Sequence, residues 1–292
     1  MSKIEFVNNK CLIQGYPGSY HEAALRAYFG EDALEPVACD SFDILAKSLD
    51  KEVAPIAMMA IENSIAGSIL QNYRILREHK LEIVGEQYLQ IQHQLMALPG
   101  HRIEDIHTVI SHPMALNQCL EFLDAYPTIE RKEFSDTALA AKEISENQKL
   151  GVAAIASSLA ADIYQLNVLA GNIETVESNY TRFFVVQKHK NESIDTAADK
   201  ASIYLKLKHH RGSLLEVLNI VNENFINLSK LQSFPVLGAV QEYYFYLDLE
   251  FDDVKNFNRC IDTLKIKCLN CETMGLYKKA AIKKLEPLNI VD

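Results

Sequence analysis

The sequence lacks tryptophan, is poor in basic residues and contains no long apolar run. Of its 292 residues, 29 are Lys or Arg and 39 are Asp or Glu, which gives a formal net charge of −10. Nucleic-acid binding needs a basic face that displaces counterions, and no stripe of Lys and Arg is present. No stretch is suited to crossing a bilayer, and charges interrupt residues 1–10, where a signal peptide needs an apolar run. We therefore expect a cytoplasmic protein with no nucleic-acid or membrane partner.

The composition is that of an ordinary globular protein, with 48% hydrophobic and 23% charged residues. The length suggests about two domains, each large enough to bury a core. The charge is unevenly distributed: residues 1–188 hold 15 basic and 25 acidic side chains, whereas residues 189–292 hold 14 of each. All of the net negative charge thus belongs to the first two thirds of the chain.

Cysteine is also sparse, and six residues in a chain of this size do not form a disulfide framework. Three lie in or beside apolar segments, as reduced core thiols do: Cys11, Cys39 and Cys119. Cys268 and Cys271 have the spacing of half a zinc site, but no convincing second half is present. We favour a structural role over a metal site and expect no metal, and the sequence suggests no function for these two residues or for Cys260.

Up to about residue 187, short apolar runs alternate with helical patterns, which is typical of a parallel α/β sheet. We expect strands at residues 11–14, 56–61, 108–110, 129–134 and 151–155. Helices are expected at residues 19–29, from about 68, at 114–124, at 138–146 and after 157. Residues 81–98 are apolar and partly alternating, as in a strand passing between lobes. The predicted architecture is two α/β lobes with a cleft between them, similar to periplasmic binding proteins.

Polar residues recur where the predicted strands lead into helices. Ser19 and Glu22 have the spacing of a capping box, in which each side chain bonds the backbone N–H of the other residue. At any single junction, the simpler interpretation is that Ser, Thr or Asp caps the helix, and this accounts for the polar residue without a ligand. Several such junctions at the carboxyl ends of strands, where helix N-termini are partly positive, favour a small, oxygen-rich, anionic ligand.

The pattern changes near residue 189. Residues 189–200 show no apolar periodicity and are interpreted as a linker. Beyond them we expect strands at residues 201–207, 226–233, 241–249 and 268–277, and helices at residues 212–224 and 253–265. The order βαββαβ is that of a ferredoxin-like module. We place a catalytic domain at residues 1–188, this module at 201–280 and a tail at 281–292, and interpret the module as regulatory or oligomerising.

Cofactor motifs are absent as well. There is no P-loop, nucleophile elbow, His-Glu-x-x-His or dinucleotide fingerprint, so no cofactor is expected.

One polar cluster, at residues 179–184, lies at the entrance to the last apolar strand before the linker. Arg182 in this cluster has two interpretations: an edge-strand or snorkelling arginine, or a guanidinium that forks onto a carboxylate.

Six segments together, in this order and spacing, resemble the prephenate dehydratase family. They are GYPGSY at 15–20, IENSIAGS at 61–68, SHPMALNQC at 111–119, DTA at 136–138, AAIAS at 153–157 and NYTRF at 179–183. The following module resembles an ACT regulatory domain, through GSLL at 212–215 and INLSK at 226–230. The resemblance covers nearly the whole chain, and no segment resembles the chorismate mutase domain fused to some relatives.

The resemblance implies a decarboxylative dehydration without a cofactor. Prephenate loses its ring carboxylate as CO2 and its ring hydroxyl as water, which gives phenylpyruvate on the way to phenylalanine. Such an enzyme holds a dianion and protonates a leaving hydroxyl. Carried over by motif, Thr181 donates to that hydroxyl and Arg182 binds a carboxylate. Hydrogen bonds that line the cleft come from Asn63, Ser64 and Thr137.

Further residues of the same motifs are expected to bind substrate: Ser19, Glu62, Ser111, His112, Asp136, Ser157 and Phe183. For His112, a structural role at the start of a helix is an equal alternative to a catalytic one. In the ACT-like module, the residues expected to bind an effector are Gly212, Ser213, Leu214, Asn227, Leu228, Gln232 and Ser233.

Phenylalanine is the effector that the resemblance implies, bound between paired ACT domains in a homodimer or homotetramer. The sequence departs from the family here, because Gln232-Ser233-Phe234-Pro235 stands where many relatives have Glu-Ser-Arg-Pro. Gln232 retains hydrogen-bonding capacity, but the charged pair is absent. We expect feedback by phenylalanine, with the strength of the coupling open.

Two other classes of function remain as alternatives. A two-lobed domain also suits a non-catalytic protein that binds small molecules, and a regulatory sensor with an inactive dehydratase domain would have the same outline. The absence of a signal-peptide pattern and the attached ACT-like module argue against the first class, and the retained Thr181-Arg182-Phe183 sequence argues against the second. Within the enzyme class, arogenate is the alternative substrate, and no residue distinguishes it from prephenate.

Overall fold

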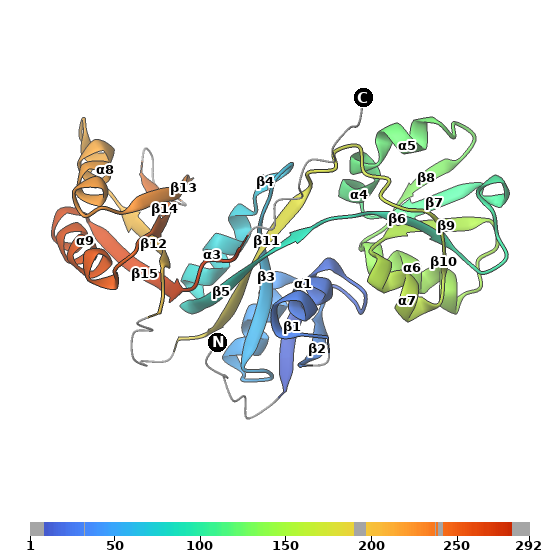
Figure 1. The fold of residues 1–292 in the computed structure, drawn as a ribbon, viewed down its shortest axis with the longest axis horizontal. Coiled ribbons are helices and arrows are strands. Elements are labelled where there is room, and N and C mark those ends of the chain that lie inside the picture. The colour runs from blue at the N-terminus through green and yellow to red at the C-terminus, as the bar shows by residue number, and fades with distance from the viewer. Residues whose placement is uncertain (1–8, 32, 190–196, 237, 239–241, 282–292) are drawn as a thin grey trace, which may run out of the picture. The chain divides into compact units, whose positions relative to one another are not determined.

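The computed structural model describes residues 9–31, 33–189, 197–236, 238 and 242–281. The chain divides into two compact units (Figure 1): residues 1–82 with 89–189, and residues 83–88 with 190–292. Most of the expected linker at 189–200 and nearly all of the expected tail at 281–292 lie outside the described residues.

The first lobe is built on a six-stranded sheet in the order β2-β1-β3-β11-β5, with the short β4 paired to β3; residues 83–88 of β5 are counted with the second unit. Its strands are β1 (Lys10–Gln14), β2 (Glu35–Cys39), β3 (Ile56–Asn63), β4 (Gly67–Ser68), β5 (Leu81–Gln90) and β11 (Tyr180–Lys188). Its helices are α1 (Tyr20–Phe29), α2 (Phe42–Asp50) and α3 (Leu70–Glu78). Residues 56–61 of β3 are all buried, as expected of a strand inside a sheet that helices cover.

The second lobe holds a five-stranded sheet in the order β10-β6-β9-β7-β8. Its strands are β6 (Gln94–Ala97), β7 (Thr108–Ser111), β8 (Glu130–Glu133), β9 (Val152–Ala156) and β10 (Asn167–Ala170). Its helices are α4 (Pro113–Gln118), α5 (Leu120–Asp124), α6 (Thr137–Glu146) and α7 (Ser158–Tyr164), with a 3-10 turn at Ile103–Asp105. The predicted architecture of two α/β lobes is confirmed.

The prediction of parallel sheets is correct only in part. β1 pairs in parallel with β2 and β3, but β11 runs antiparallel to β3. In the second lobe, β6 runs antiparallel to β9 and β10. The chain crosses from the first lobe to the second at residues 91–93 and returns at residues 171–179. The strands that follow these crossings, β6 and β11, therefore run antiparallel to their neighbours β9 and β3.

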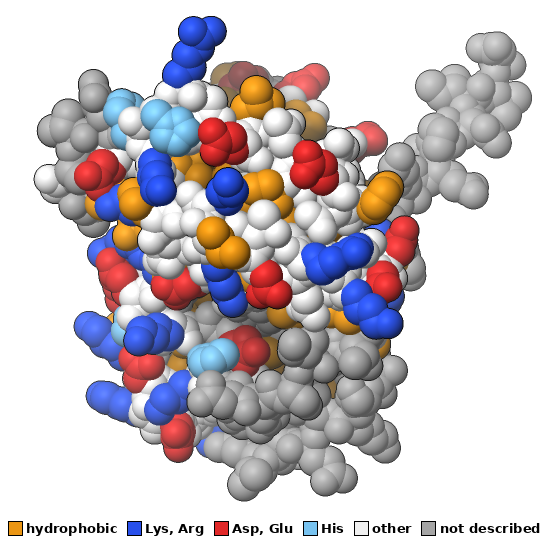
Figure 2. Space-filling model, turned by 90° about the vertical axis from the view of Figure 1, so that its left-hand side faces the viewer, with side chains coloured by type: hydrophobic (Ala, Val, Ile, Leu, Met, Phe, Trp, Pro, Cys, Tyr) orange, Lys and Arg blue, Asp and Glu red, His pale blue; other side chains and the backbone are white. Residues whose placement is uncertain are grey.

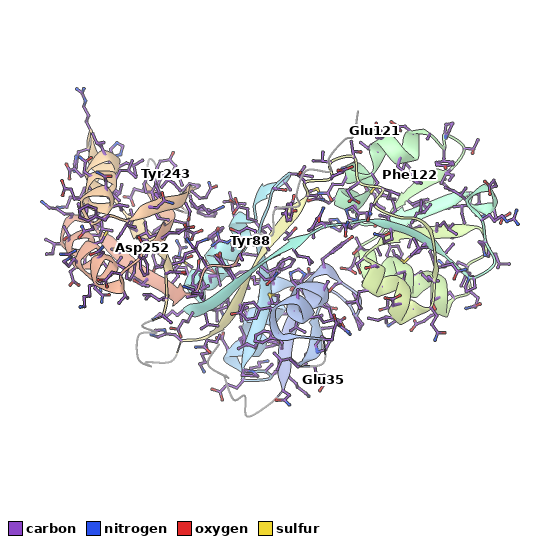
Figure 3. All side chains as sticks on the ribbon, in the orientation of Figure 1. Glu35, Tyr88, Glu121, Phe122, Tyr243 and Asp252 are labelled. Carbon is purple, nitrogen blue, oxygen red and sulfur yellow. The ribbon has the colours of Figure 1, made fainter. Side chains whose placement is uncertain are left out.

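Two local predictions also need correction. The expected helix at residues 114–124 is broken at Cys119, which ends α4 and begins α5, the helix that carries Glu121 and Phe122 (Figure 3). The capping box at Ser19 is half formed. The Ser19 hydroxyl accepts from the Glu22 N–H, but the Glu22 carboxylate accepts from the Gly18 N–H at 2.7 Å and also binds Arg26.

The second unit contains the expected βαββαβ order. Its elements are β12 (Lys200–Lys206), α8 (Ser213–Glu223), β13 (Asn227–Pro235), β14 (Tyr243–Glu250), α9 (Val254–Lys267) and β15 (Asn270–Tyr277). The antiparallel sheet has the order β13-β14-β12-β15, which is the ferredoxin-like arrangement. Basic and acidic side chains are interspersed on the face drawn in Figure 2.

The three cysteines of this unit are buried in its apolar core, beside side chains of β12, α8 and α9. Burial raises the pKa of the Cys260 thiol to about 11 and that of Cys271 to about 12. Such thiols are protonated at neutral pH and pack as small apolar groups. Within the described ranges, no three His, Cys, Asp or Glu side chains gather as potential metal ligands.

Among the helices of the described residues, none is long and apolar enough to cross a membrane.

Candidate functional site

The pair Thr181 and Asn63 forms the centre of the candidate site, on adjacent strands β11 and β3 where they leave the sheet. Asn63 Nδ2 donates to Thr181 Oγ1 at 3.0 Å and lies 2.8 Å from Asn179 Oδ1. Asn63 Oδ1 accepts from the backbone N–H groups of Ile65 and Ala66, so both ends of the side-chain amide are fixed. Since Thr181 Oγ1 accepts from Asn63, its own proton remains to be donated to a ligand.

A chain of partly buried hydrogen bonds continues from this pair. Asn179 Nδ2 donates to Gln118 Oε1 at 3.1 Å, and the same oxygen lies 2.8 Å from His93 Nε2. Because Gln118 Oε1 only accepts, His93 carries its proton on Nε2, and its Nδ1 lies 2.8 Å from the Tyr20 hydroxyl, which also donates to the Gln92 carbonyl at 3.1 Å. Burial lowers the pKa of His93, which keeps the ring neutral. The chain thus connects α1 and α4 to Asn179, which bonds Asn63.

Sequence reasoning assigned no role to His93 or Gln118. His93 stands as an isolated polar residue in an apolar stretch, and Gln118 lies inside one of the quoted motifs. The sequence therefore marks both residues as candidates, but only the fold brings Gln118 and Asn179, which are 61 positions apart, into contact.

Three of the residues predicted to bind substrate cap helices, in agreement with the simpler, structural interpretation of these side chains. The side chains of Ser19, Asp136 and Ser157 accept from backbone N–H groups at the starts of α1, α6 and α7. Ser157 also donates to the Gly18 carbonyl at 2.6 Å, and Tyr164 donates to the Pro17 carbonyl at 2.9 Å. These two bonds fasten the loop before α1 in the first lobe to α7 in the second.

Asp136 lies at the same contact between the lobes. A side chain added at Gly15 would place its Cβ 2.9 Å from Asp136 Oδ2, so only glycine fits beside this carboxylate. Gly15 also has a φ of +95°, which favours glycine. Burial raises the pKa of Asp136, and nearby His112 opposes this effect. Thr137 follows as the first residue of α6 and is half-buried.

The remaining predicted residues have mainly structural partners. Ser64 donates to the Ser178 carbonyl and accepts from the Tyr180 N–H, which ties the β3–β4 hairpin to the start of β11. Ser111 is fully buried and donates to the Ile155 carbonyl at 2.6 Å, between β7 and β9. His112 is exposed and caps α4 by accepting from the Met114 N–H at 3.2 Å, in agreement with its structural interpretation.

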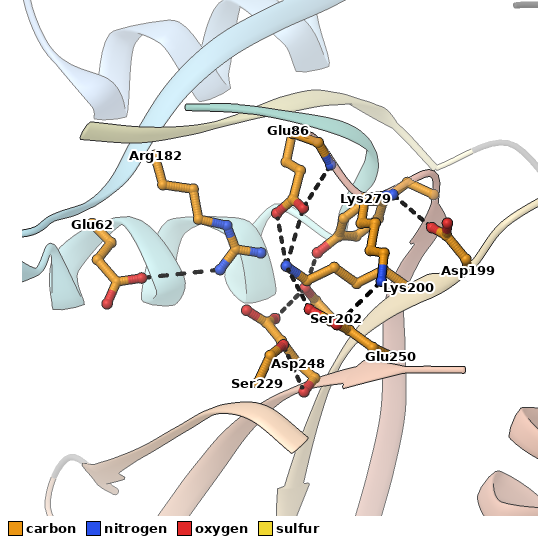
Figure 4. Close-up of polar contacts among 12 residues, drawn as sticks. Glu62, Glu86, Arg182, Asp199, Lys200, Ser202, Ser229, Asp248, Glu250 and Lys279 are labelled. Carbon is orange, nitrogen blue, oxygen red and sulfur yellow. Dashed lines mark hydrogen bonds and ion pairs between the residues drawn. The ribbon is translucent and has the colours of Figure 1, made fainter. Parts of the chain in front are cut away.

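Arg182 is not brought into the group around Thr181. Successive residues of a strand point to opposite faces, so Arg182 lies on the face of β11 opposite Thr181. Its side chain is 2% exposed, its guanidinium carbon lies 4.6 Å from the centre of the Phe184 ring, and its Nη1 is 4.0 Å from Glu62 Oε2 (Figure 4). Phe183 is buried on the other face, where its ring contacts His21. The geometry favours a structural role for Arg182.

Comparison with known proteins identifies the family of the chain. The profile of the family described as "PDT: Prephenate dehydratase" matches residues 11–191. Arogenate dehydratase/prephenate dehydratase 1, chloroplastic, of Arabidopsis thaliana is 37% identical over 252 residues, which cover 81% of this chain and 63% of the relative. The chain therefore spans less than two thirds of that relative's length.

Two solved structures are similar over most of the chain. Prephenate dehydratase from Arthrobacter aurescens in complex with L-Phe gives a TM-score of 0.82 at 28% identity, over 92% of this chain and 89% of that one. The structure described as GqqA, a novel type of quorum quenching acylase, gives 0.84 at 25% identity, over 94% and 99%. On its motifs, fold and relatives, the chain belongs to the prephenate dehydratase family.

Proposed function

We propose that this chain is a prephenate dehydratase, which converts prephenate to phenylpyruvate, CO2 and water. The observation that carries the proposal is the hydrogen bond from Asn63 Nδ2 to Thr181 Oγ1, because an oxygen that accepts from Asn63 keeps its own proton to donate to a ligand. As the ring carboxylate leaves as CO2, its bonding electrons aromatise the ring and expel the hydroxyl. Thr181 donates a proton to that leaving oxygen, and a proton from solvent then restores the threonine hydroxyl, so that each turnover consumes one solvent proton.

Asn63 has a distinct part in this step. Its N–H bond to Thr181 Oγ1 stabilises the negative charge that develops on this oxygen as the proton departs. Both ends of the Asn63 amide are held before the reaction, so little reorganisation is needed. Thr137, at the partly positive start of α6, is proposed to bind a substrate carboxylate. The charge of −10 gives no long-range attraction for the dianion, and binding relies on contacts at short range.

Assay of the purified chain with prephenate and, separately, with arogenate tests the proposal. Phenylpyruvate formed from prephenate at the higher kcat/KM is the expected result. Preference for arogenate, with phenylalanine as the product, would establish the alternative substrate. Turnover of neither substrate, with either one bound, would favour the non-catalytic binding protein.

Arg182→Met is expected to lower the melting temperature while changing the kcat of the folded protein by less than about tenfold. The buried guanidinium packs on Phe184 and lies on the strand face opposite Thr181, so its loss affects packing before chemistry. Thermal unfolding and steady-state kinetics on the same samples measure both effects. A rise in KM of a hundredfold without loss of stability would restore the carboxylate-binding role that the motif implies.

We further propose that the second unit is an ACT domain that binds phenylalanine in a homodimer or homotetramer. The supporting observations are its ferredoxin-like fold and the complex with L-Phe of the Arthrobacter aurescens relative. Gly212 caps α8 with a φ of +90°, and Ser213 and Leu214 begin that helix. The other proposed effector residues lie on β13, an edge strand of the sheet: Asn227, Leu228, Gln232 and Ser233.

Phenylalanine at millimolar concentration is expected to inhibit the dehydratase activity, with weaker coupling than in relatives that retain the charged pair. Gln232 is half-buried and donates to the Ser233 carbonyl at 2.9 Å. It can therefore still contact an effector by hydrogen bonding. Titration of the initial rate with phenylalanine measures the effect, with tyrosine as the matched control ligand. An initial rate that stays unchanged up to about 10 mM phenylalanine would reject feedback by this effector.

A further inference from the structure

The strand pair that carries the candidate site has a shift in register directly beside it. Along β11, Phe183 lies opposite Ala60, but Arg182 lies opposite Glu62, so Ile61 is an extra residue on β3. Continued without the shift, the pairing would place Glu62 opposite Thr181. With the shift, Asn63 takes that place. A β-bulge thus decides whether an amide or a carboxylate faces the proposed proton donor.

Two buried side chains hold β3 at this shift, and both bond Ala60. The Ala60 N–H donates to His21 Nε2 at 3.3 Å, and the Ala60 carbonyl accepts from Asn72 Nδ2 at 2.6 Å. His21 comes from α1 and Asn72 from α3, so helices on both sides of β3 in the sequence fix one residue. Neither backbone group of Ala60 is left unpaired in the core, where an unpaired group would be costly.

His21 also contacts the opposite strand at the same level. Its ring lies edge-on to the ring of Phe183, with the centroids 5.0 Å apart, and Phe183 is the residue paired with Ala60. One side chain therefore contacts both members of the pair at which the register shifts. Burial lowers the pKa of His21 to about 3, so its Nε2 stays an unprotonated acceptor throughout the working range of pH.

We propose that His21 and Asn72 are positioning residues that fix the β3 bulge and so keep Asn63, and not Glu62, opposite Thr181. The proposal rests on the proposed dehydratase function. Neither residue is proposed to touch the substrate, because both are buried and committed to Ala60. Their effect on the reaction passes through the Asn63–Thr181 bond.

The test compares His21→Phe with His21→Gln. Phenylalanine keeps a ring beside Phe183 but removes the acceptor, whereas glutamine supplies an acceptor oxygen. For His21→Phe we expect kcat to fall by about 10- to 100-fold with KM within about threefold, which is the scale of a small misplacement of reacting groups. His21→Gln is expected to regain most of that loss. Asn72→Leu, which removes the donor to the Ala60 carbonyl, provides a second variant if His21→Phe does not fold.

A double-mutant cycle separates positioning from general destabilisation. Acting through Asn63, His21→Phe should cost less than about twofold in an Asn63→Ala background. Ile144→Ala, in the core of the second lobe, is the control for lost stability. Equal losses of kcat in both backgrounds, or a loss no greater than in an Ile144→Ala protein of similar melting temperature, would overturn the proposal.

Hydrogen exchange distinguishes a failure of this proposal from a failure of the proposed function. Residues 56–64 should exchange faster in His21→Phe than in the wild-type chain, whether or not either dehydrates prephenate. Unchanged exchange in this segment would overturn the positioning role on its own. Inactive wild-type protein with faster exchange in the variant would instead retain the role in the bulge and refute the dehydratase function.

Discussion

Thr181→Ala is expected to lower kcat for prephenate by a factor of about 10²–10³, the loss typical of removing one positioned hydrogen-bond donor from an active site. Thr181 is 9% exposed and its hydroxyl accepts from Asn63, so in the proposed reaction the hydroxyl proton goes to the leaving oxygen. Aromatisation supplies the driving force in both proteins, but the variant lacks the hydroxyl that donates a proton to the leaving group. Steady-state formation of phenylpyruvate measures the loss.

Thr181→Ser and Thr181→Val are the matched controls for this prediction. Serine keeps the hydroxyl and should retain activity within about tenfold, whereas valine keeps the shape without the hydroxyl and should resemble alanine. Equal activity in the valine variant and the wild-type chain would contradict the role of Thr181 as donor.

Lys200→Met is expected to lower the free energy of unfolding of the second unit by about 3–5 kcal/mol, the cost of leaving one charge of a buried pair alone. Lys200 Nζ lies 3.0 and 3.1 Å from the two carboxylate oxygens of Glu86, and their side chains are only 4% and 1% exposed (Figure 4). Glu86 Oε1 also accepts from the Ala280 N–H. Denaturation by urea, followed by circular dichroism, measures the change.

The control for this prediction is Lys206→Met on the same strand. Lys206 pairs with Glu242, but both side chains are solvent-accessible, so the midpoint of unfolding should shift far less. Combining Lys200→Met with Glu86→Gln removes the carboxylate charge that Lys200 neutralises in the wild-type chain and should recover part of the lost stability. A double variant less stable than Lys200→Met would contradict the assignment of the cost to the loss of the Lys200 charge beside Glu86.

The elements that local pattern determines were predicted well. The second unit follows the expected βαββαβ order, because each of its strands and helices has its own apolar periodicity. Helix α6 begins at Thr137, one residue before its expected start at residue 138. By contrast, the antiparallel direction of β11 depends on where the chain returns from the other lobe, which no window of sequence contains.

The candidate site likewise contains residues that the sequence identifies and contacts that depend on the fold. Motifs identified Thr181 and Asn63, although 118 positions separate them. The orientation of Arg182 was not predictable, because it depends on which face of β11 each side chain takes. Ser157 carries both a helix cap and a bond between the lobes, and only the cap has a local signal. Likewise, the bulge at Ala60 follows from contacts of two helices.

Asn63 and Thr181 are expected to act as one unit in proton donation. A double-mutant cycle with Asn63→Ala and Thr181→Ala, measured as kcat for phenylpyruvate formation, detects this coupling. Asn63→Ala should cost about 10- to 100-fold in the wild-type chain but less than about threefold once Thr181 is alanine. Equal losses in the two backgrounds would show that the residues act independently and would refute their joint role.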